Sequence, residues 1–494
     1  MKKYILTIDQ GTTSTRAILF DKKGRKVCVK QMEFNQITPK SGWVLHNPEE
    51  IYLTVLQVIK SVINDSGINV MEIDSIGITN QRETVVVWNK ETLEPLYPAI
   101  VWQSRQSEDI CNELIEAGYN DIIHEKTGLF INPYFSASKI KWILDRYDTD
   151  RKLRDNDRLL CGTIDTYLLY RLTNGRSFKT DYTNASRTML FNINTLTWDS
   201  ELLKLFGVKE NMLATVCDSS SLFGYFEYSG VNIPITSMVG DQQASLFGHV
   251  AFNKGSTKVT YGTGCFMLMN TANKKIFSKN GLLTTIAYKY GDTLCYALEG
   301  SVFVAGSAVQ WLRDGLKIIK HSSDTEALAT IVSDSLGVYF VPAFVGMGTP
   351  YWDNESRGAI FGLSRGVKKE HLIRATLEGI AYEALDVLEV MEKEAKVKIP
   401  EISVDGGAAV NNFLIQFESD ITERRLVRPS ELETTALGAC YLAGLYTKFY
   451  KDIDEIEKLH EFDKLFMPNM EKKKRDYLVE GWKIAVNATR MFKR

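Results

Sequence analysis

The stretch Tyr4-Ile-Leu-Thr-Ile-Asp-Gln-Gly-Thr-Thr-Ser-Thr-Arg-Ala-Ile-Leu-Phe-Asp21 holds two β-rich runs on either side of a small polar turn. This pattern predicts a β-hairpin that reverses at Gly11. A backbone that wraps around a phosphate also needs glycine or small hydroxyl residues, so that its N–H groups can converge on the anion. The turn is therefore either a phosphate clamp or a purely structural reversal.

The same pattern returns about half a chain later. Lys258-Val-Thr-Tyr leads into Gly262-Thr-Gly and then into Cys265-Phe-Met-Leu-Met-Asn. A second hairpin with a second phosphate turn is predicted there. We infer two similarly built halves that meet near residues 245–255, and we place the two domains at residues 1–250 and 251–494.

The other predicted elements mix strands and helices, as expected of an α/β fold. Ile73–Thr79 and Thr84–Trp88 flank Asn80-Gln-Arg-Glu and predict a third hairpin. Apolar residues at helical spacing predict one long helix between Val367 and Ala395. A strand at Ile402–Val404, a helix from about Asn411 and a buried Ala/Gly-rich helix at Thr434–Tyr446 follow.

Length and composition exclude several classes of protein. The chain has 494 residues, 44% of them hydrophobic, with 59 Lys and Arg against 61 Asp and Glu, a net charge of −2. No positive excess favours nucleic acid or an anionic membrane. The seven cysteines are scattered without a C-x-x-C pair, and no apolar run approaches the roughly 18 residues of a membrane span. We expect a cytoplasmic protein with reduced thiols, no membrane insertion and a small-molecule partner.

The usual nucleotide-binding and metal-binding motifs are absent from the sequence. It contains no P-loop, no protein-kinase motif, no G-x-G-x-x-G and no pair of histidines at ligand spacing. A carboxylate base becomes the more plausible catalyst. Asp241 is the leading candidate, because the apolar run Ile233–Gly240 delivers it to a strand end, where it can accept the proton of an alcohol that attacks phosphorus. Its alternative role is to cap the helix that follows.

Two further candidates come from the same reasoning. Arg82 and Glu83 set a donor fork beside an acceptor, which suits a polyol whose hydroxyls both donate and accept; a solvated charged turn is the alternative. Asp9 ends the first strand beside Gly11, where it can hold Mg²⁺ directly or through water. Its alternative is to cap the turn.

Several motifs, taken together and in order, resemble one family. They are Asp9-Gln-Gly-Thr-Thr-Ser-Thr-Arg, Gly77-Ile-Thr-Asn-Gln-Arg-Glu-Thr, Thr180-Asp-Tyr-Thr-Asn-Ala-Ser-Arg-Thr, Gly240-Asp-Gln-Gln, Tyr261-Gly-Thr-Gly-Cys-Phe-Met-Leu-Met-Asn, Gly281-Leu-Leu-Thr-Thr-Ile, Gln310-Trp-Leu-Arg-Asp and Val404-Asp-Gly-Gly-Ala. Over nearly the whole chain they resemble the FGGY carbohydrate kinases, and in particular the branch that phosphorylates glycerol.

The resemblance implies an α/β fold of two actin-like (ribonuclease-H-like) domains flanking a deep catalytic cleft. It also implies in-line transfer of the γ-phosphoryl group of ATP, with Mg²⁺, to glycerol, which gives sn-glycerol 3-phosphate in glycerol uptake and catabolism. The first domain would carry the glycerol pocket and the phosphate hairpin, and the second would bind the nucleotide. A homo-oligomer, dimer or tetramer, is expected.

The resemblance also carries site residues onto this sequence, and Asp241 falls on the family's general base. The implied glycerol contacts are Arg82, Glu83, Trp102, Tyr134, Asp241, Gln242 and Phe266. The implied ATP contacts are Thr12, Thr13, Ser14, Arg16, Thr263, Gly306, Gln310, Gly407 and Asn411. Asp9 is the implied magnesium-associated carboxylate.

The chain departs from the regulatory patterns of some relatives. The segment Phe223–Asn232 lacks the Gly-Gly-Thr-Arg loop for fructose 1,6-bisphosphate, and Glu227 stands where other members have a phosphorylated histidine. Lys474 stands where a zinc-ligating glutamate would serve a sugar-transport regulator. These controls are expected to be absent. A kinase of another polyol or sugar on the same fold, and a non-metabolic ATP-driven switch protein, remain as alternatives.

Overall fold

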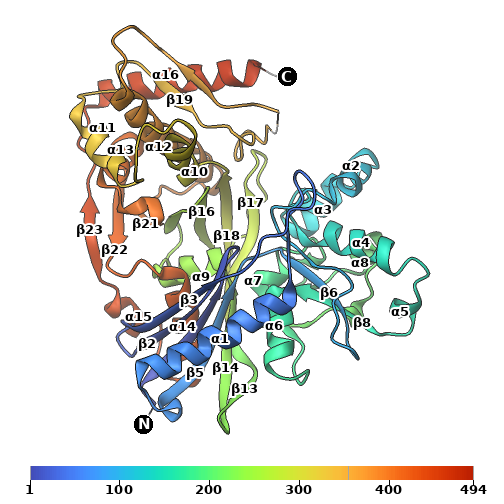
Figure 1. Ribbon diagram of the computed structural model, residues 1–494. Coiled ribbons are helices and arrows are strands. Elements are labelled where there is room, and N and C mark those ends of the chain that lie inside the picture. The colour runs from blue at the N-terminus through green and yellow to red at the C-terminus, as the bar shows by residue number, and fades with distance from the viewer. Residues whose placement is uncertain (1, 354, 493–494) are drawn as a thin grey trace. The chain divides into compact units, whose positions relative to one another are not determined.

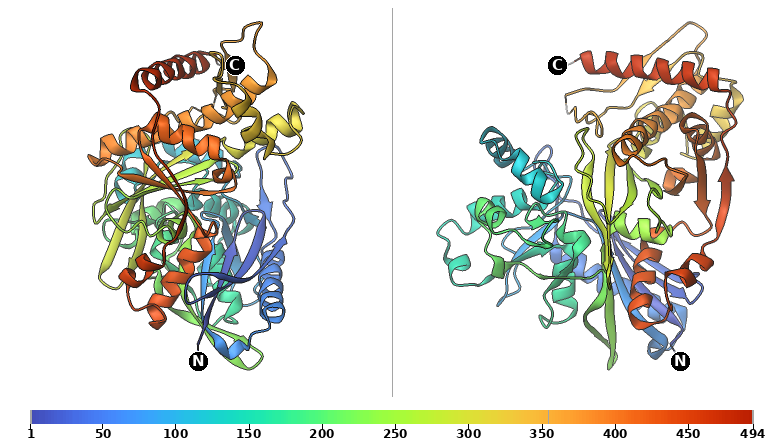
Figure 2. Two further views of the ribbon diagram at one scale, coloured as in Figure 1. Left: turned by 90° about the vertical axis from the view of Figure 1, so that its left-hand side faces the viewer. Right: turned by 180° about the vertical axis from the view of Figure 1, so that it is seen from behind.

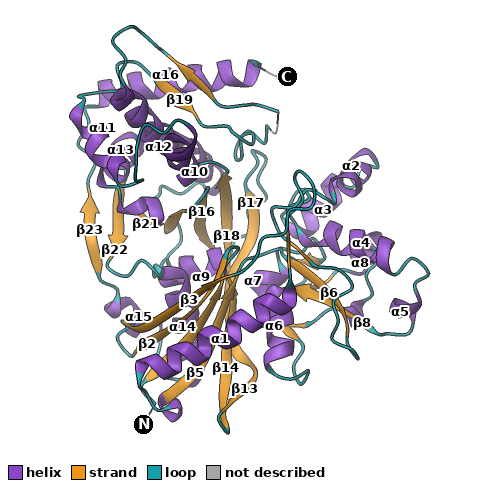
Figure 3. Ribbon diagram, in the orientation of Figure 1, coloured by secondary structure: helices purple, strands orange, loops and turns teal. Residues whose placement is uncertain are grey.

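The computed structural model describes residues 2–353 and 355–492. These residues form two compact units. Unit 1 comprises Met1–Val250, Thr284–Tyr296 and Thr434–His460, and unit 2 comprises Ala251–Leu283, Ala297–Glu433 and Glu461–Arg494. Both units mix helices with strands (Figures 1 and 3).

Unit 1 is built on a sheet whose six described strands lie in the order β13-β14-β5-β1-β2-β3. Their bounds are β1 (Tyr4–Gln10), β2 (Ser14–Asp21), β3 (Lys26–Glu33), β5 (Ile73–Asn80), β13 (Ser220–Tyr228) and β14 (Val231–Gly240). β1 and β2 pair antiparallel, with Tyr4 opposite Asp21 and Gln10 opposite Thr15. The first predicted hairpin is confirmed. β5 lies parallel to both β1 and β14.

Alternating side chains of β1 and β2 bury one face of this sheet. Leu6, Ile8 and Leu19 share a core with the apolar stripe of α1 (Pro48–Ser66). This helix begins at Asn47, whose side chain accepts hydrogen bonds from two N–H groups of the first turn, and ends at Gly67 in the left-handed conformation. α6 (Ile164–Leu172) contributes to the same core.

The helix α14 (Thr434–Thr447) contacts β1, β5 and β14 and crosses α9 (Asp241–Gly248). The crossing is close because a glycine lies on each side. A Cβ on Gly438 would stand 1.8 Å from the carbonyl oxygen of Ala244, and one on Gly248 would stand 2.0 Å from that of Thr434. The buried Ala/Gly-rich helix expected here is confirmed, and its composition follows from this approach.

A second sheet of unit 1 has the order β4-β7-β6-β8 among the described strands. Its strands are β4 (Leu45–His46), β6 (Val85–Asn89), β7 (Ala99–Ile100) and β8 (Leu159–Thr163). The remaining elements of the unit are η1 (Val70–Glu72), α2 (Glu108–Glu116), α3 (Asn120–Thr127), α4 (Ser136–Tyr147), α5 (Lys152–Asp155), β9 (Lys179–Asp181), α7 (Tyr182–Ala185), β10 (Phe191–Asn192), β11 (Thr197–Trp198), α8 (Ser200–Phe206), η2 (Glu210–Met212), β12 (Thr215–Cys217) and α15 (Ile453–Leu459).

The third predicted hairpin is wrong. β5 belongs to the six-stranded sheet and β6 to the four-stranded one. Between them the backbone N–H of Gln81 donates to the carbonyl of Gln10 at 2.7 Å, which carries the chain past the end of β1 instead of back along β5. Glu83 then takes a φ of 59°, a left-handed conformation that turns the chain into the second sheet.

Unit 2 contains most of a sheet with the order β17-β18-β16-β15-β21-β22-β23 among the described residues. The strands are β15 (Thr257–Tyr261), β16 (Cys265–Ala272), β17 (Leu283–Tyr290), β18 (Thr293–Val302), β21 (Glu401–Gly406), β22 (Arg425–Pro429) and β23 (Phe462–Phe466). β15 and β16 form the predicted hairpin, with Tyr261 opposite Cys265. β21 lies parallel to β15 and to β22. The arrangement β16-β15-β21-β22 therefore repeats β2-β1-β5-β14, which confirms the expectation of two similarly built halves.

The long helix expected between Val367 and Ala395 is α12 (Lys369–Ala395), which packs in the core of unit 2. The other elements of this unit are α10 (Gly306–Gln310), η3 (Trp311–Gly315), α11 (Asp324–Ile331), β19 (Tyr339–Val341), β20 (Ala359–Phe361), η4 (Gly407–Val410), α13 (Asn412–Thr422) and α16 (Lys472–Met491). α16 contacts α13 and β19, and it can be followed in red in Figure 2. Across the described residues, every helix is too short or too polar to cross a bilayer.

The α9–α14 crossing leads to a stability prediction. Gly438→Ala forces a methyl group into the carbonyl of Ala244, and overpacking of this kind costs about 1–3 kcal/mol. We expect a lower midpoint in urea unfolding followed by circular dichroism. Gly366→Ala is the control, because the nearest atom to its added methyl group lies at 3.4 Å. Equal midpoints for the two variants would contradict the close crossing.

Candidate active site

Three parallel strands of unit 1 end at one edge of its sheet. Gln10 of β1 lies beside Asn80 of β5, and Asn80 lies beside Gly240 of β14. Ligands of open α/β sheets bind outside the carboxyl ends of the strands. The register therefore brings three candidate segments to the same edge: the turn that begins at Gly11, the pair Arg82–Glu83, and Asp241 with Gln242.

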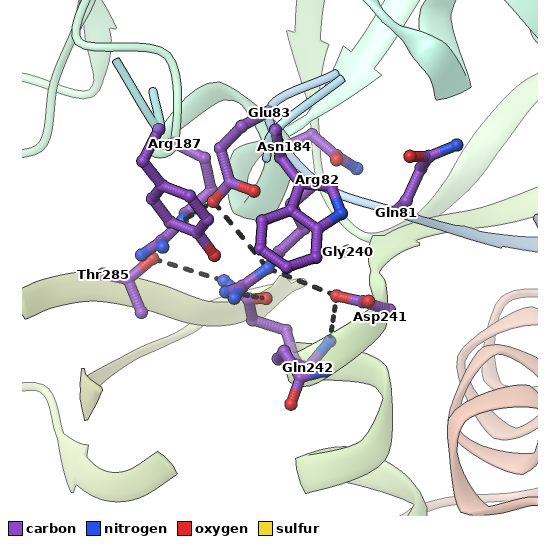
Figure 4. Close-up of polar contacts among 12 residues, drawn as sticks. Gln81, Arg82, Glu83, Asn184, Arg187, Gly240, Asp241, Gln242 and Thr285 are labelled. Carbon is purple, nitrogen blue, oxygen red and sulfur yellow. Dashed lines mark hydrogen bonds and ion pairs between the residues drawn. The ribbon is translucent and has the colours of Figure 1, made fainter. Parts of the chain in front are cut away.

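Asp241 is the first residue of α9 and lies against Arg82 (Figure 4). Oδ1 of Asp241 stands 3.2 Å from Nε of Arg82, and it also accepts a hydrogen bond from the N–H of Gln242 at 2.7 Å. The Arg82 side chain is 2% exposed, whereas that of Asp241 is 31% exposed. Asp241 therefore bonds within the first turn of α9, where Gly240 is the N-cap residue and no side chain caps the helix, and part of its carboxylate remains exposed to solvent.

Arg82 is fixed from two more sides. Its Nη1 donates to Oε1 of Gln243 at 3.1 Å, and the amide of Gln243 donates in turn to Thr285 at 3.2 Å. A Cβ on Gly240 would stand 2.8 Å from Cδ of Arg82, so this position requires glycine. The guanidinium therefore has a fixed direction toward Asp241.

Glu83 is buried, with 1% of its side chain exposed, and pairs with Arg187. Nε of Arg187 donates to Oε1 of Glu83 at 2.6 Å, while Nε of Arg82 stands 3.9 Å from the same oxygen. Charges alternate along the row Asp241, Arg82, Glu83 and Arg187. The alternative of a solvated turn at Arg82–Glu83 is therefore excluded by burial.

The segment Thr180–Thr188 supports this edge of unit 1. Thr183 Oγ1 accepts the N–H of Gly240 at 2.8 Å, and Asn184 exchanges two side-chain hydrogen bonds with Asn80 at 2.9 and 3.1 Å. Arg187 reaches Glu83. Sequence reasoning used this segment only for its resemblance and assigned no role to its residues; the signal available was that Arg187 belongs to one of the motifs that carry the resemblance.

Trp102 and Tyr134 stand edge to face, with ring centroids 5.5 Å apart at 90°. Nε1 of Trp102 donates to Oγ1 of Thr12 at 2.9 Å. The carbonyl of Tyr134 accepts from Nζ of Lys139, a completely buried lysine that sequence reasoning also missed. Burial lowers the pKa of Lys139 to about 7, against an opposing contribution from Glu83.

The turn of the first hairpin closes on itself, because the N–H of Gly11 donates to the carbonyl of Ser14 at 2.9 Å. Thr12 is half-buried and Thr13 exposed, while Asp9 and Arg16 lie opposite each other in the second residue pair from the turn. A single carboxylate beside this turn has the chemistry expected of an Mg²⁺ site, because Mg²⁺ keeps several waters and is bound by only one or two carboxylates. Among the described residues there is no group of three or more His, Cys, Asp or Glu arranged to hold a metal.

In unit 2 the turn Gly262–Gly264 packs against the start of α10. The N–H of Gly306 donates to the carbonyl of Gly262 at 3.0 Å, and the N–H of Ala305 donates to that of Thr263 at 2.9 Å. A Cβ on Gly306 would stand 2.5 Å from the carbonyl oxygen of Gly262. Thr263 and Gly306 are therefore neighbours, and Gln310 is exposed at the end of the same helix.

The other expected residues of unit 2 lie on three elements. Gly407 begins η4, and a Cβ placed on it would meet nothing within 4 Å. Asn411 caps α13 by accepting the N–H of Leu414 at 3.0 Å, and its amide donates to Thr325 at 3.1 Å. Phe266 lies in β16 opposite Thr260 and is half-buried.

A buried tyrosine–glutamate pair lies where β15 enters the Gly262–Gly264 turn. Tyr261, the last residue of β15, donates its hydroxyl to Oε2 of Glu418 in α13 at 2.5 Å. Burial raises the pKa of Glu418 to about 7, and the bond from Tyr261 lowers it by a smaller amount. Oε1 of Glu418 has no hydrogen-bond partner among the described residues, which favours the protonated acid.

Comparison with known proteins defines the class. Residues 4–248 match the N-terminal domain of the FGGY family of carbohydrate kinases, and residues 257–446 match its C-terminal domain. The chain belongs to this family, and the predicted α/β fold of two actin-like domains is confirmed.

Individual relatives are similar over their whole length. Glycerol kinase of Bacillus licheniformis is 54% identical with all of both chains covered, and that of Treponema denticola is 56% identical over 98% of this chain and 99% of its own. The structure of Plasmodium falciparum glycerol kinase with ADP superposes with a TM-score of 0.93 at 36% identity, covering 98% of each chain. A ligand-bound xylulose kinase of Lactobacillus acidophilus shares the fold at 24% identity, with a TM-score of 0.88 over 98% of this chain and 97% of that one.

The Tyr261–Glu418 pair predicts a pH dependence. A glutamate whose pKa rises from 4.5 to about 7 on folding retains a proton that the unfolded chain loses, so it stabilises the fold below 4.5 and this contribution is lost as the pH rises to about 7. The side chain of Glu418→Gln does not titrate, so this variant lacks the pH-dependent contribution. Between pH 4.5 and 7 we expect the unfolding free energy of the parent to fall relative to that of Glu418→Gln, by on the order of 3 kcal/mol.

The measurement is urea unfolding of both proteins at several pH values. Glu392→Gln, which changes a partly exposed glutamate that bonds Arg424, is the control for loss of a carboxylate in the same unit. Parallel curves for the parent and Glu418→Gln would show that Glu418 is ionised in the folded protein throughout this range.

Proposed function

We propose that the protein is a glycerol kinase, which transfers the γ-phosphoryl group of ATP to a terminal hydroxyl of glycerol and yields sn-glycerol 3-phosphate and ADP. The observation that carries the proposal is the partly exposed Asp241 carboxylate held against a row of buried, alternating charges. Full-length relatives at 53–56% identity, all glycerol kinases, support the choice of substrate.

Asp241 acts as the general base in this proposal. Its carboxylate accepts the proton of the hydroxyl while that oxygen attacks phosphorus, and the bond from phosphorus to the bridging oxygen breaks as ADP leaves. Arg82, fixed by Gln243 and Gly240, holds the carboxylate in place and leaves its exposed face toward the substrate.

The remaining expected contacts have chemistry suited to glycerol. Arg82 and Gln242 supply donors, Glu83 and Asp241 supply acceptors, and a triol needs both. Trp102, Tyr134 and Phe266 present apolar ring surface that can cover the carbon backbone. The charges are paired within the protein, which suits an uncharged ligand.

The nucleotide contacts are proposed on the two hairpin turns and their neighbours. Thr12, Thr13, Ser14, Arg16 and Thr263 would contact phosphate, and Gly306, Gln310, Gly407 and Asn411 would contact the rest of ATP. Asp9 would hold Mg²⁺, which neutralises phosphate charge when bound. We further propose residues 1–250 as the glycerol domain with the phosphate hairpin and residues 251–494 as the nucleotide domain, in a cytoplasmic homo-oligomer, dimer or tetramer, that serves glycerol uptake and catabolism.

The substrate is tested by ATP consumption with glycerol, dihydroxyacetone, erythritol, xylulose or no acceptor. We expect glycerol to give the highest kcat/KM and the no-acceptor reaction to be slow. A rate with xylulose that exceeds the rate with glycerol would favour a sugar kinase. No stimulation by any of them would favour an ATP-driven switch protein.

The base is tested by Asp241→Asn. The amide keeps the shape of the side chain but cannot take a proton, so we expect kcat to fall by about 100- to 10,000-fold while glycerol and ATP still bind in calorimetry. Asp145→Asn, on the surface of α4 beside Lys141, is the matched control. A near-normal kcat for Asp241→Asn would remove Asp241 from the role of base.

A further inference from the structure

The turn between β1 and β2 is surrounded by donors that bind its carbonyl groups. The carbonyl of Gly11 accepts from the side-chain amides of Gln10 at 2.7 Å and Gln81 at 3.2 Å. The carbonyl of Thr12 accepts from the side-chain amide of Gln36 at 3.0 Å, and the carbonyl of Thr13 accepts from the N–H of Phe34 at 3.4 Å. Three successive carbonyls are therefore held from outside the turn.

Holding the carbonyls also sets the N–H groups. In a trans peptide the C=O of one residue and the N–H of the next point in opposite directions. Fixing the carbonyls of Gly11, Thr12 and Thr13 thus fixes the N–H directions of Thr12, Thr13 and Ser14. These are the residues proposed to contact phosphate, so this step rests on the proposed function.

His46 links two of these amides. Its Nε2 lies 2.8 Å from Oε1 of Gln36, and its Nδ1 lies 3.4 Å from Nε2 of Gln81. The same nitrogen of Gln81 also donates to Oε1 of Gln10 at 3.0 Å, so its two hydrogens are shared among three acceptors and the contact with His46 is the longest of them. His46 is completely buried, and burial lowers its pKa to about 4, so the ring is neutral at physiological pH.

The chemistry of the neighbours decides which nitrogen of His46 carries the proton. The amide nitrogen of Gln36 faces two carbonyls, those of Thr12 and Phe34, so it must be the donor and the amide oxygen must face His46. That oxygen needs a proton from Nε2. Nδ1 is then an acceptor, in agreement with Gln81, whose oxygen is already taken by the hydroxyl of Thr84 at 2.9 Å.

We propose that Gln81, His46 and Gln36 form a neutral hydrogen-bond relay, with the imidazole proton on Nε2, which positions the Gly11–Ser14 turn for phosphate. These are positioning residues, because they act through the carbonyls of the turn and not on the substrate. Preorganised N–H groups bind an anion without the cost of reorienting at the moment of binding. Because the relay carries no charge, the attraction for phosphate comes from the N–H groups of the turn and from Arg16.

The test uses two substitutions of the exposed Gln36, which leave the buried core untouched. Gln36→Met removes both of its links. Gln36→Glu keeps an acceptor for His46 but loses the donor to the Thr12 carbonyl. We expect each to raise KM for ATP about 10-fold, the effect of a lost hydrogen bond to a positioned group, with KM for glycerol changed by less than about twofold. Gln57→Met and Gln57→Glu, on the exposed side of α1, are the matched controls.

The relay itself is read by nitrogen NMR of histidine-labelled protein, with the His46 signals assigned from a His46→Gln sample. We expect the Nε2–H tautomer in the parent and in Gln36→Glu, and a mixture in Gln36→Met. A proton on Nδ1 in the parent would overturn the proposal, and so would an unchanged KM for ATP in Gln36→Met.

The two proposals fail in different ways. A parent protein that does not consume ATP with glycerol would overturn the proposed function, and the tautomer of His46, which needs no turnover, would still decide the relay. A fully active parent with unaltered Gln36 variants would leave the function in place and overturn the relay.

Discussion

The parallel register of β1, β5 and β14 is the constraint on which the candidate site of unit 1 depends. Gln10, Asn80 and Gly240 lie side by side, so the residues that follow them emerge at one edge of the sheet. Hydrogen-bonded strands are about 4.8 Å apart, so the residues that follow the three strand ends lie within reach of one small ligand. A shift of one residue in β5 would turn Arg82 and Glu83 to the opposite faces of the chain.

Burial explains why the charged residues at this edge come as a connected set. Arg82, Glu83 and Arg187 are each at most 2% exposed, and a buried ion without a partner costs several kcal/mol. Each of these side chains therefore requires an oppositely charged neighbour, and the row ends at Asp241, which has solvent on one side. Asp241, the residue proposed as the general base, is thus the one residue of this row that is not fully enclosed.

Much of the fold could be predicted from the sequence, and the prediction that failed did so for a physical reason. The two hairpins, α12 and α14 follow from local periodicity and from glycine spacing, which act within a few residues. The supposed hairpin at Ile73–Trp88 failed because strand partners are chosen by packing over long distances, and two β-rich runs separated by a polar turn do not reveal that they enter different sheets.

The same limit applies to the site. The resemblance supplied the expected ligand contacts, but it did not indicate the buried residues that support them. Arg187 stands 104 positions from Glu83, and Lys139 is a lysine that composition alone would place on the surface. His46 was counted only as a histidine without a metal-ligand spacing. Its role depends on two glutamines that the fold, not the sequence, brings to it.

Unit 2 holds the carbonyls of its hairpin turn with different donors from those in unit 1. The carbonyls of Gly262 and Thr263 are also held from outside their turn, but here the donors are the backbone N–H groups of Ala305, Gly306 and Ser307 at 2.9–3.1 Å. A helix start supplies such donors without side chains, provided that it can come close, and only glycine at 306 allows the approach. Among the described residues of unit 1, side-chain amides hold the carbonyls of Gly11 and Thr12, and the backbone N–H of Phe34, just after β3, holds that of Thr13. Carbonyl anchoring is therefore common to both turns, whereas the residues that perform it are not. A glycine such as Gly306 can be required for the packing of the turn as much as for contact with a nucleotide.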